Sequence, residues 1–195
     1  MSIAQLFLDN AFIRVLRGQT APRELLLAMT GVGLGERLLV IGQSEPSLLA
    51  ILATKVGLTG RACGVDRSAT QLEKARRSAE REGVLVELER LEGDGWPFED
   101  GSFDVVAIRP RGEWATEAAL RPAISAARRL LRDGGRCVVI TDAAPSGLSK
   151  LRGRSAGPSP ALLLGWFSEA GFRGARLLAE REGLGFVEAI CRSGP

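Results

Sequence analysis

The stretch VIGQSEP, residues 40–46, joins an apolar run, RLLVIG, to a helical pattern, PSLLAILATKVG. A strand that runs directly into a helix is a common place to bind a nucleotide, because backbone N–H groups at the start of the helix point at the ligand. Such turns usually carry several glycines, which let the backbone approach the ligand closely. This turn carries one, Gly42. Two interpretations follow: a cofactor-binding turn of unusual sequence, or a turn that has lost its ligand.

The side chains available for catalysis are limited, because the chain contains no histidine and no tyrosine. This excludes a Ser-His-Asp triad and the most common general base and metal ligand, so any proton transfer must use Asp, Glu, Cys, Lys or water. The three cysteines, Cys63, Cys137 and Cys191, each lie in an apolar run and lack zinc-like spacing. We interpret them as buried core residues. The sequence predicts no metal site, and it names no catalytic residue.

The bulk composition predicts a soluble globular protein of one domain, with 195 residues, 45% of them hydrophobic and 25% charged. A net charge of +3 gives only a weak argument for nucleic acid, and an RNA-binding protein, which would use the KLRGR stretch at 150–154, is the least favoured class. The N-terminal apolar pattern includes Asp9 and Arg14, which argues against a signal peptide, and no uncharged run approaches the length of a membrane span. We expect a cytoplasmic protein.

The hydrophobic periodicity predicts strands that alternate with helices, which implies a mostly parallel sheet with helices on both faces. The last two strands are joined by REGLG without a helix, so the final strand is expected to run antiparallel, at or near an edge. Residues 142–159 show no periodicity and are expected to form a loop. Helices are expected over 3–17, 20–31, 46–56, 68–81, 116–132 and 160–170, and strands over 37–42, 62–66, 84–91, 103–109, 136–141, 173–180 and 184–192.

Five segments, in the right order and spacing, resemble the class I S-adenosylmethionine-dependent methyltransferases. The resemblance is nearest to the small-molecule branch that includes quinone-biosynthesis enzymes. It implies one Rossmann-like domain over 1–195, with a seven-stranded, mostly parallel sheet whose last strand is antiparallel, a helical lid over 1–35 and a core over 36–195. The segments are RLLVIG, TGRACGVDRSATQLEKARR, LEGDGWPFEDGSFDVV, ARRLLRDGGRCVVI and FSEAGFRGARLLAEREGLGFVEAI.

By this resemblance, S-adenosylmethionine is the expected cofactor. Asp66, at a strand end, is expected to accept the ribose hydroxyls; its alternative role is that of a helix-capping acid beside Ser68. Asp94 is expected to reach the adenine amine, and Trp96 either to stack on adenine or to pack against the following helix. The complete expected cofactor-binding set is Gly42, Gln43, Ser44, Asp66, Arg67, Asp94, Gly95, Trp96 and Arg109.

The turn after the first strand departs from the family pattern. Val40 stands at the position of the family's acid, and Ser44 and Pro46 stand at two of its three glycine positions. Ser44 has a Cβ and is expected to resist a positive φ. Glu45 is expected either to compete with the cofactor's carboxylate for N–H groups at the helix start or to pair with its ammonium group. The chain is therefore either a methyltransferase with a divergent turn or a scaffold or partner subunit that has lost the cofactor.

Arg109 ends the fourth expected strand and Arg111 follows it, in the stretch that faces the methyl group and the substrate in the family. Guanidinium groups suit carboxylate or phosphate, so both are candidates for binding an anionic substrate. The alternative is a solvated, charged loop. The expected partner is a small-molecule substrate or another protein. The sequence does not determine the methyl acceptor, a general base or the oligomeric state.

Overall fold

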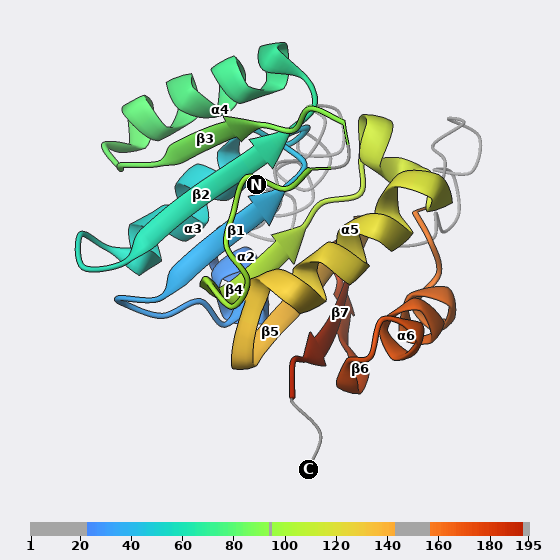
Figure 1. Ribbon diagram of the computed structural model, residues 1–195. Helices are drawn as coiled ribbons and strands as arrows, with labels where there is room; N and C mark the ends of the chain where they lie inside the picture. The colour runs from blue at the N-terminus through green and yellow to red at the C-terminus, as the bar shows by residue number, and fades with distance from the viewer. Residues whose placement is uncertain (1–22, 94, 143–156, 193–195) are drawn as a thin grey trace, which may run out of the picture.

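The computed structural model describes residues 23–93, 95–142 and 157–192, which form one seven-stranded sheet in the order β3-β2-β1-β4-β5-β7-β6 (Figure 1). The neighbouring pairs from β3 to β5 are parallel, whereas β7 is antiparallel to both β5 and β6. The predicted sheet, with only the last strand reversed and lying next to an edge, is confirmed. The strands are β1 Arg37–Ile41, β2 Arg61–Asp66, β3 Glu87–Arg90, β4 Phe103–Ile108, β5 Leu131–Asp142, β6 Arg173–Arg181 and β7 Leu184–Ile190.

Helices cover both faces of the sheet, with α2, α3 and α4 on one side and α5 and α6 on the other (Figure 1). Strand β1 is buried on both faces. Leu38 and Val40 belong to the core cluster shared with α2 and α3, and Leu39 and Ile41 to the one shared with α5 and α6. The alternation of side chains along a strand explains this division. The helices are α2 Arg23–Thr30, α3 Ser47–Val56, α4 Ala69–Glu82, α5 Glu117–Leu130 and α6 Pro160–Glu169, with a short 3-10 helix, η1, at Gly112–Ala115.

Most expected elements are found within a few residues of their predicted bounds. Ser68 caps α4 by accepting a hydrogen bond from the N–H of Gln71, and Thr116 caps α5 in the same way. Pro122 lies inside α5 and does not mark its start. The expected helix at 3–17, the first residues of the one at 20–31 and most of the expected loop at 142–159 lie outside the described residues.

Strand β5 begins five residues earlier than predicted, because the Asp133-Gly134-Gly135 segment is part of the sheet. The N–H of Gly134 donates to the carbonyl of Cys191 at 2.7 Å, and the N–H of Cys191 donates to the carbonyl of Gly135 at 2.7 Å. The pairing between β4 and β5 shifts its register here, which accommodates the extra residues. The sequence pattern of a turn thus marks an irregularity within a strand.

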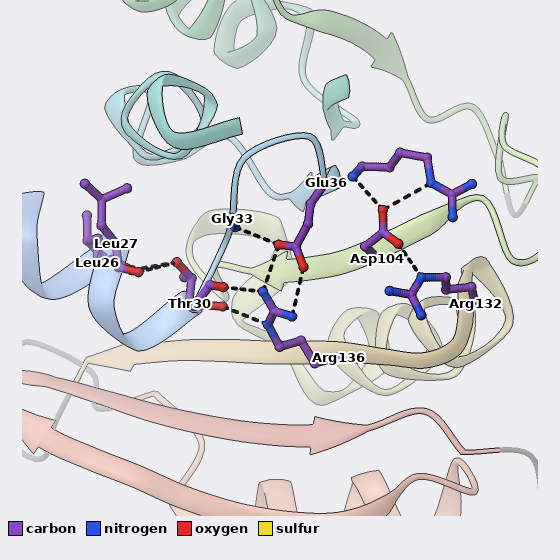
Figure 2. A network of polar contacts seen from close by, with 10 residues as sticks. Leu26, Leu27, Thr30, Gly33, Glu36, Asp104, Arg132 and Arg136 are labelled. Carbon is purple, nitrogen blue, oxygen red and sulfur yellow. Dashed lines mark hydrogen bonds and ion pairs between the residues drawn. The ribbon is translucent and has the colours of Figure 1, made fainter. Parts of the chain in front are cut away.

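Two carboxylates tie together the amino ends of β1, β4 and β5 (Figure 2). Asp104 accepts hydrogen bonds from the backbone and side chain of Arg37, at 2.7 and 3.1 Å, and from Arg132. Glu36 pairs with Arg136 at 2.9 Å. Burial alone would raise the pKa of Asp104, but the hydrogen bonds from Arg37 and Arg132 bring it down to about 2. This network holds these strands together at their amino ends, opposite the carboxyl ends of the strands.

Candidate functional site

The candidate site lies at the carboxyl ends of β1, β2 and β4, where ligands bind in open α/β sheets (Figure 1). At the end of β1, Gly42 has φ of 85°, a conformation that favours glycine. A Cβ at this position would lie 2.8 Å from the carbonyl oxygen of Arg109 and 3.1 Å from the Trp114 ring. The single glycine of the turn is therefore required both by its backbone conformation and by the close approach of β4.

The rest of the turn does not show the strain expected from its sequence. Among the described non-glycine residues, only Glu182 has a positive φ, so the expected resistance of Ser44 to such a conformation does not arise. The Ser44 hydroxyl donates a hydrogen bond of 3.2 Å to the carbonyl of Arg111, which joins the turn to the segment after β4. The N–H of Gln43 donates to Asp66, as described next.

Asp66 ends β2, is 3% exposed and joins three segments of the site. Its Oδ2 accepts hydrogen bonds from the N–H of Gln43 at 2.6 Å and from the indole Nε1 of Trp114 at 3.3 Å. Its Oδ1 accepts one from the N–H of Ser68 at 2.8 Å, while the Ser68 hydroxyl caps α4. Asp66 therefore supports the start of α4, and the same carboxylate also faces the turn after β1.

The indole of Trp114, on η1, lies at the centre of the site and is 1% exposed. The guanidinium carbon of Arg67 stands 5.6 Å from its ring centroid. The half-buried Trp96 packs against it with ring centroids 6.3 Å apart and ring planes tilted by 48°. Asp66, Arg67 and Trp96, three residues predicted for the cofactor, thus converge on one side chain.

Trp114 was not among the predicted site residues. The available signal was an aromatic residue in the polar stretch RPRGEW, directly after a buried strand.

Two of the remaining predicted residues are Gly95 and Asp94. Gly95 is exposed, with open space where a Cβ would stand. Asp94 lies outside the described residues.

Arg109 follows β4 and is 1% exposed, so its interpretation as part of a solvated loop is wrong. Its Nε donates to Glu45 at 2.9 Å, its Nη1 to the carbonyl of Ile140 at 2.6 Å, and its Nη2 to Asp142 at 2.9 Å. Arg111 donates two further hydrogen bonds to Asp142, at 2.5 and 3.0 Å. Burial alone would raise the pKa of Asp142, but the hydrogen bond from Arg111 and the charge of Arg109 bring it below its ordinary value.

Two acceptor oxygens in the turn after β1 lack a hydrogen-bond donor. They are Gln43 Oε1 and Glu45 Oε1, which are buried and unpaired among the residues that the structure describes. Glu45 turns its other oxygen toward Arg109, and no side chain caps the start of α3, so the expected competition for those N–H groups is not seen. A buried acceptor without a donor is costly, and a ligand that donates a hydrogen bond would satisfy it.

Cysteines, metal ligands and membrane spans contribute nothing further to this site. The three cysteines are free and buried. In the described part of the chain, no three His, Cys, Asp or Glu side chains are close enough to hold a metal ion. None of its helices is long and apolar enough to span a membrane.

Comparison with known proteins places this geometry in context. A family model described as a methyltransferase domain matches residues 39–135. A protein of Saccharolobus solfataricus named as a probable cobalt-precorrin-6B C(15)-methyltransferase (decarboxylating) is 28% identical over 120 residues, 60% of this chain and 58% of that protein. The ubiquinone/menaquinone biosynthesis C-methyltransferase UbiE of Pseudomonas fluorescens is 29% identical over 128 residues, 64% of this chain and 48% of that protein. The chain therefore spans less than two thirds of the length of each of these two relatives.

Among solved structures, an S-adenosylmethionine-dependent methyltransferase from Aquifex aeolicus superposes with a TM-score of 0.70. The match covers 87% of this chain and 89% of that chain, at 19% identity. At this identity the likeness shows the fold, and it agrees with the strand order described above.

Proposed function

We propose that this chain, which belongs to the class I S-adenosylmethionine-dependent methyltransferases, transfers the methyl group of S-adenosylmethionine to a small-molecule acceptor. The observation that carries the proposal is the carboxylate of Asp66 at the end of β2, facing the turn at Gly42 and an aromatic subsite. Ribose hydroxyls are donors that suit such a carboxylate. The small-molecule acceptor class is supported by the acceptors in the relatives' names, a cobalt-precorrin and a quinone.

The residues at the carboxyl ends of β1, β2 and β4 fit this cofactor. Asp66 would accept the ribose hydroxyls in place of the Trp114 indole N–H. Arg67 and Trp96 both contact a flat ring of indole size, which adenine matches in shape and in its π-face. The unpaired Glu45 Oε1 would accept a hydrogen bond from the ammonium group at the cofactor's amino-acid end.

The cofactor, when bound, supplies a methyl group on a positively charged sulfur, which leaves as a neutral thioether. The protein's part is then to align the acceptor and to exclude water. The chain has no histidine or tyrosine, and Glu45 and Asp142 are held in ion pairs with Arg109. These residues favour an acceptor that is already nucleophilic and needs no strong general base.

The sequence also left open a scaffold that has lost its cofactor. The two relatives described above bear methyltransferase names, and Ser44 lacks the backbone strain on which that alternative partly rested.

Calorimetric titration with S-adenosylmethionine and S-adenosylhomocysteine tests the proposal. The wild-type protein is expected to bind both. Asp66→Ala removes the acceptor for the ribose hydroxyls and is expected to weaken binding at least about tenfold, because each hydrogen bond to a charged group is worth about 1.5–3 kcal/mol. Asp100→Ala, which removes an exposed carboxylate paired with Arg129, is the matched control and should bind as the wild type does. No binding of either ligand to the wild type at millimolar concentration would refute the proposal.

A further inference from the structure

We infer that Trp114 fills the subsite for the cofactor's nucleoside, so that its indole must leave before S-adenosylmethionine binds. The inference rests on the proposed function and deepens it, because it names the residue that sets the apparent affinity of the site.

Trp114 contacts three of the residues expected to hold the nucleoside, Asp66, Arg67 and Trp96. Its N–H donates to Asp66 Oδ2, as a ribose hydroxyl would. Its ring contacts both Arg67 and Trp96, the two side chains that a base would meet. Its Cδ1 would be 3.1 Å from a Cβ on Gly42, so the indole also covers the glycine that the close approach of a ligand requires. With 1% of its surface exposed, Trp114 leaves no room for a second ring in the same place.

The segment that carries Trp114 is built to be displaced more easily than the strands around it. Its 3-10 helix spans only four residues, and short 3-10 turns have poorer hydrogen-bond geometry than α-helices. The residues on either side, Arg111 and Thr116, are extended, and Gly112 has φ of 60°. The N–H of Trp114 donates to the carbonyl of Arg111 at 3.2 Å, a long hydrogen bond at the start of this turn. β4 and α5 are held in a core cluster that also includes the Trp114 ring, so the displacement is confined to η1 and exposes one buried aromatic side chain.

The consequence is a lowered apparent affinity. When only a fraction of the molecules has the indole displaced, the apparent dissociation constant is the intrinsic one divided by that fraction. A change that weakens the hold of Trp114 raises the fraction and tightens binding. If Trp114 instead helped to hold the cofactor, its replacement would weaken binding. The direction of the change in affinity therefore distinguishes the two roles.

Two substitutions distinguish these two roles of Trp114. Trp114→Phe keeps an aromatic ring and removes the N–H that binds Asp66, and Trp114→Ala empties the subsite. Trp166→Phe is the matched control, because Trp166 is a buried tryptophan on α6, away from the turn at Gly42. In calorimetric titration with S-adenosylhomocysteine, both Trp114 variants are expected to bind about tenfold or more tightly than the wild type, and the control is expected to match the wild type. Adding S-adenosylhomocysteine to the wild type should also shift tryptophan emission to the red, as a buried indole enters water, and Trp114→Phe should abolish that shift.

The outcomes distinguish this inference from the function on which it rests. Tighter binding by Trp114→Phe together with loss of the red shift supports both. If the wild type binds and Trp114→Phe binds equally or more weakly, the inference is overturned and the proposed function stands. If the wild type does not bind at millimolar ligand, the proposed function and the inference that rests on it are both overturned. Circular dichroism verifies the fold of each variant, and Trp114→Phe decides alone if Trp114→Ala does not fold.

Discussion

Replacement of Arg109 by methionine tests whether the buried ion cluster holds the carboxyl edge of the sheet together. Arg109 is buried and donates to Glu45, to the carbonyl of Ile140 and to Asp142. Glu45 is 8% exposed, and one of its oxygens already lacks a donor. Arg109→Met leaves that carboxylate charged and buried, with Arg111 as its nearest remaining cation, 3.9 Å away.

Breaking a buried ion pair in this way costs about 3–5 kcal/mol, because the remaining charge is desolvated without compensation. For a chain of this length, each kcal/mol lowers the melting temperature by about 2–4 °C, so a fall of about 6–20 °C is expected. The double variant Arg109→Met/Glu45→Gln removes the uncompensated charge and should recover much of the lost stability. The double variant is therefore expected to lose much less free energy of unfolding than the sum of the losses in the two single variants.

The assay is urea unfolding followed by circular dichroism, on the wild type, the two single variants and the double variant. Arg121→Met is the control, because Arg121 pairs on the exposed surface with Glu117 and Glu169, and such pairs contribute at most about 1 kcal/mol. A loss below about 1 kcal/mol in Arg109→Met, or additive effects in the double variant, would refute the argument that Arg109 compensates a buried charge.

Two further predictions concern the ends of the strands. Gly42→Ala should destabilise the protein more than Gly83→Ala, because both glycines have positive φ but only the Cβ at Gly42 meets backbone, 2.8 Å away; equal losses on urea unfolding would contradict this. The pKa of Asp104 is lowered from its ordinary value of 3.8 to about 2 in the folded protein. The ionised carboxylate therefore stabilises the fold at any pH above 3.8, and this contribution, about 2 kcal/mol, is lost as the pH falls from about 4 to 2. Asp104→Asn should flatten that part of the stability profile, and an unchanged slope would exclude Asp104 as its source.

The sequence determined the architecture because the relevant signals are local. Alternating apolar runs specify strands and helices, and the short REGLG connection specifies an antiparallel final pair. The position of Asp66 at a strand end followed from the same pattern, since the carboxyl ends of parallel strands share one edge. The sequence could also place the family resemblance on five segments, because their order and spacing are properties of the chain.

Predictions from the sequence were wrong for residues whose environment is formed by segments that are distant in the chain. Arginine is usually exposed, and the burial of Arg109 depends on partners at Glu45, Ile140 and Asp142, which the fold brings together from the ends of β1 and β5. Val40, which stands at the position of the family's acid, is fully buried in the apolar core beside α3, so an aspartate there would be a buried charge without a partner.

Trp114 shows most clearly what only the tertiary structure decided. Periodicity describes neighbours within a few residues, whereas the indole meets Asp66 across 48 positions of the chain. That contact depends on the path of η1 out of β4 and on the space left above Gly42. The sequence named Asp66, Arg67 and Trp96 as residues for a cofactor, and the fold assembled them around a side chain of the protein itself, because a desolvated aromatic subsite is filled by whichever ring the packing brings to it.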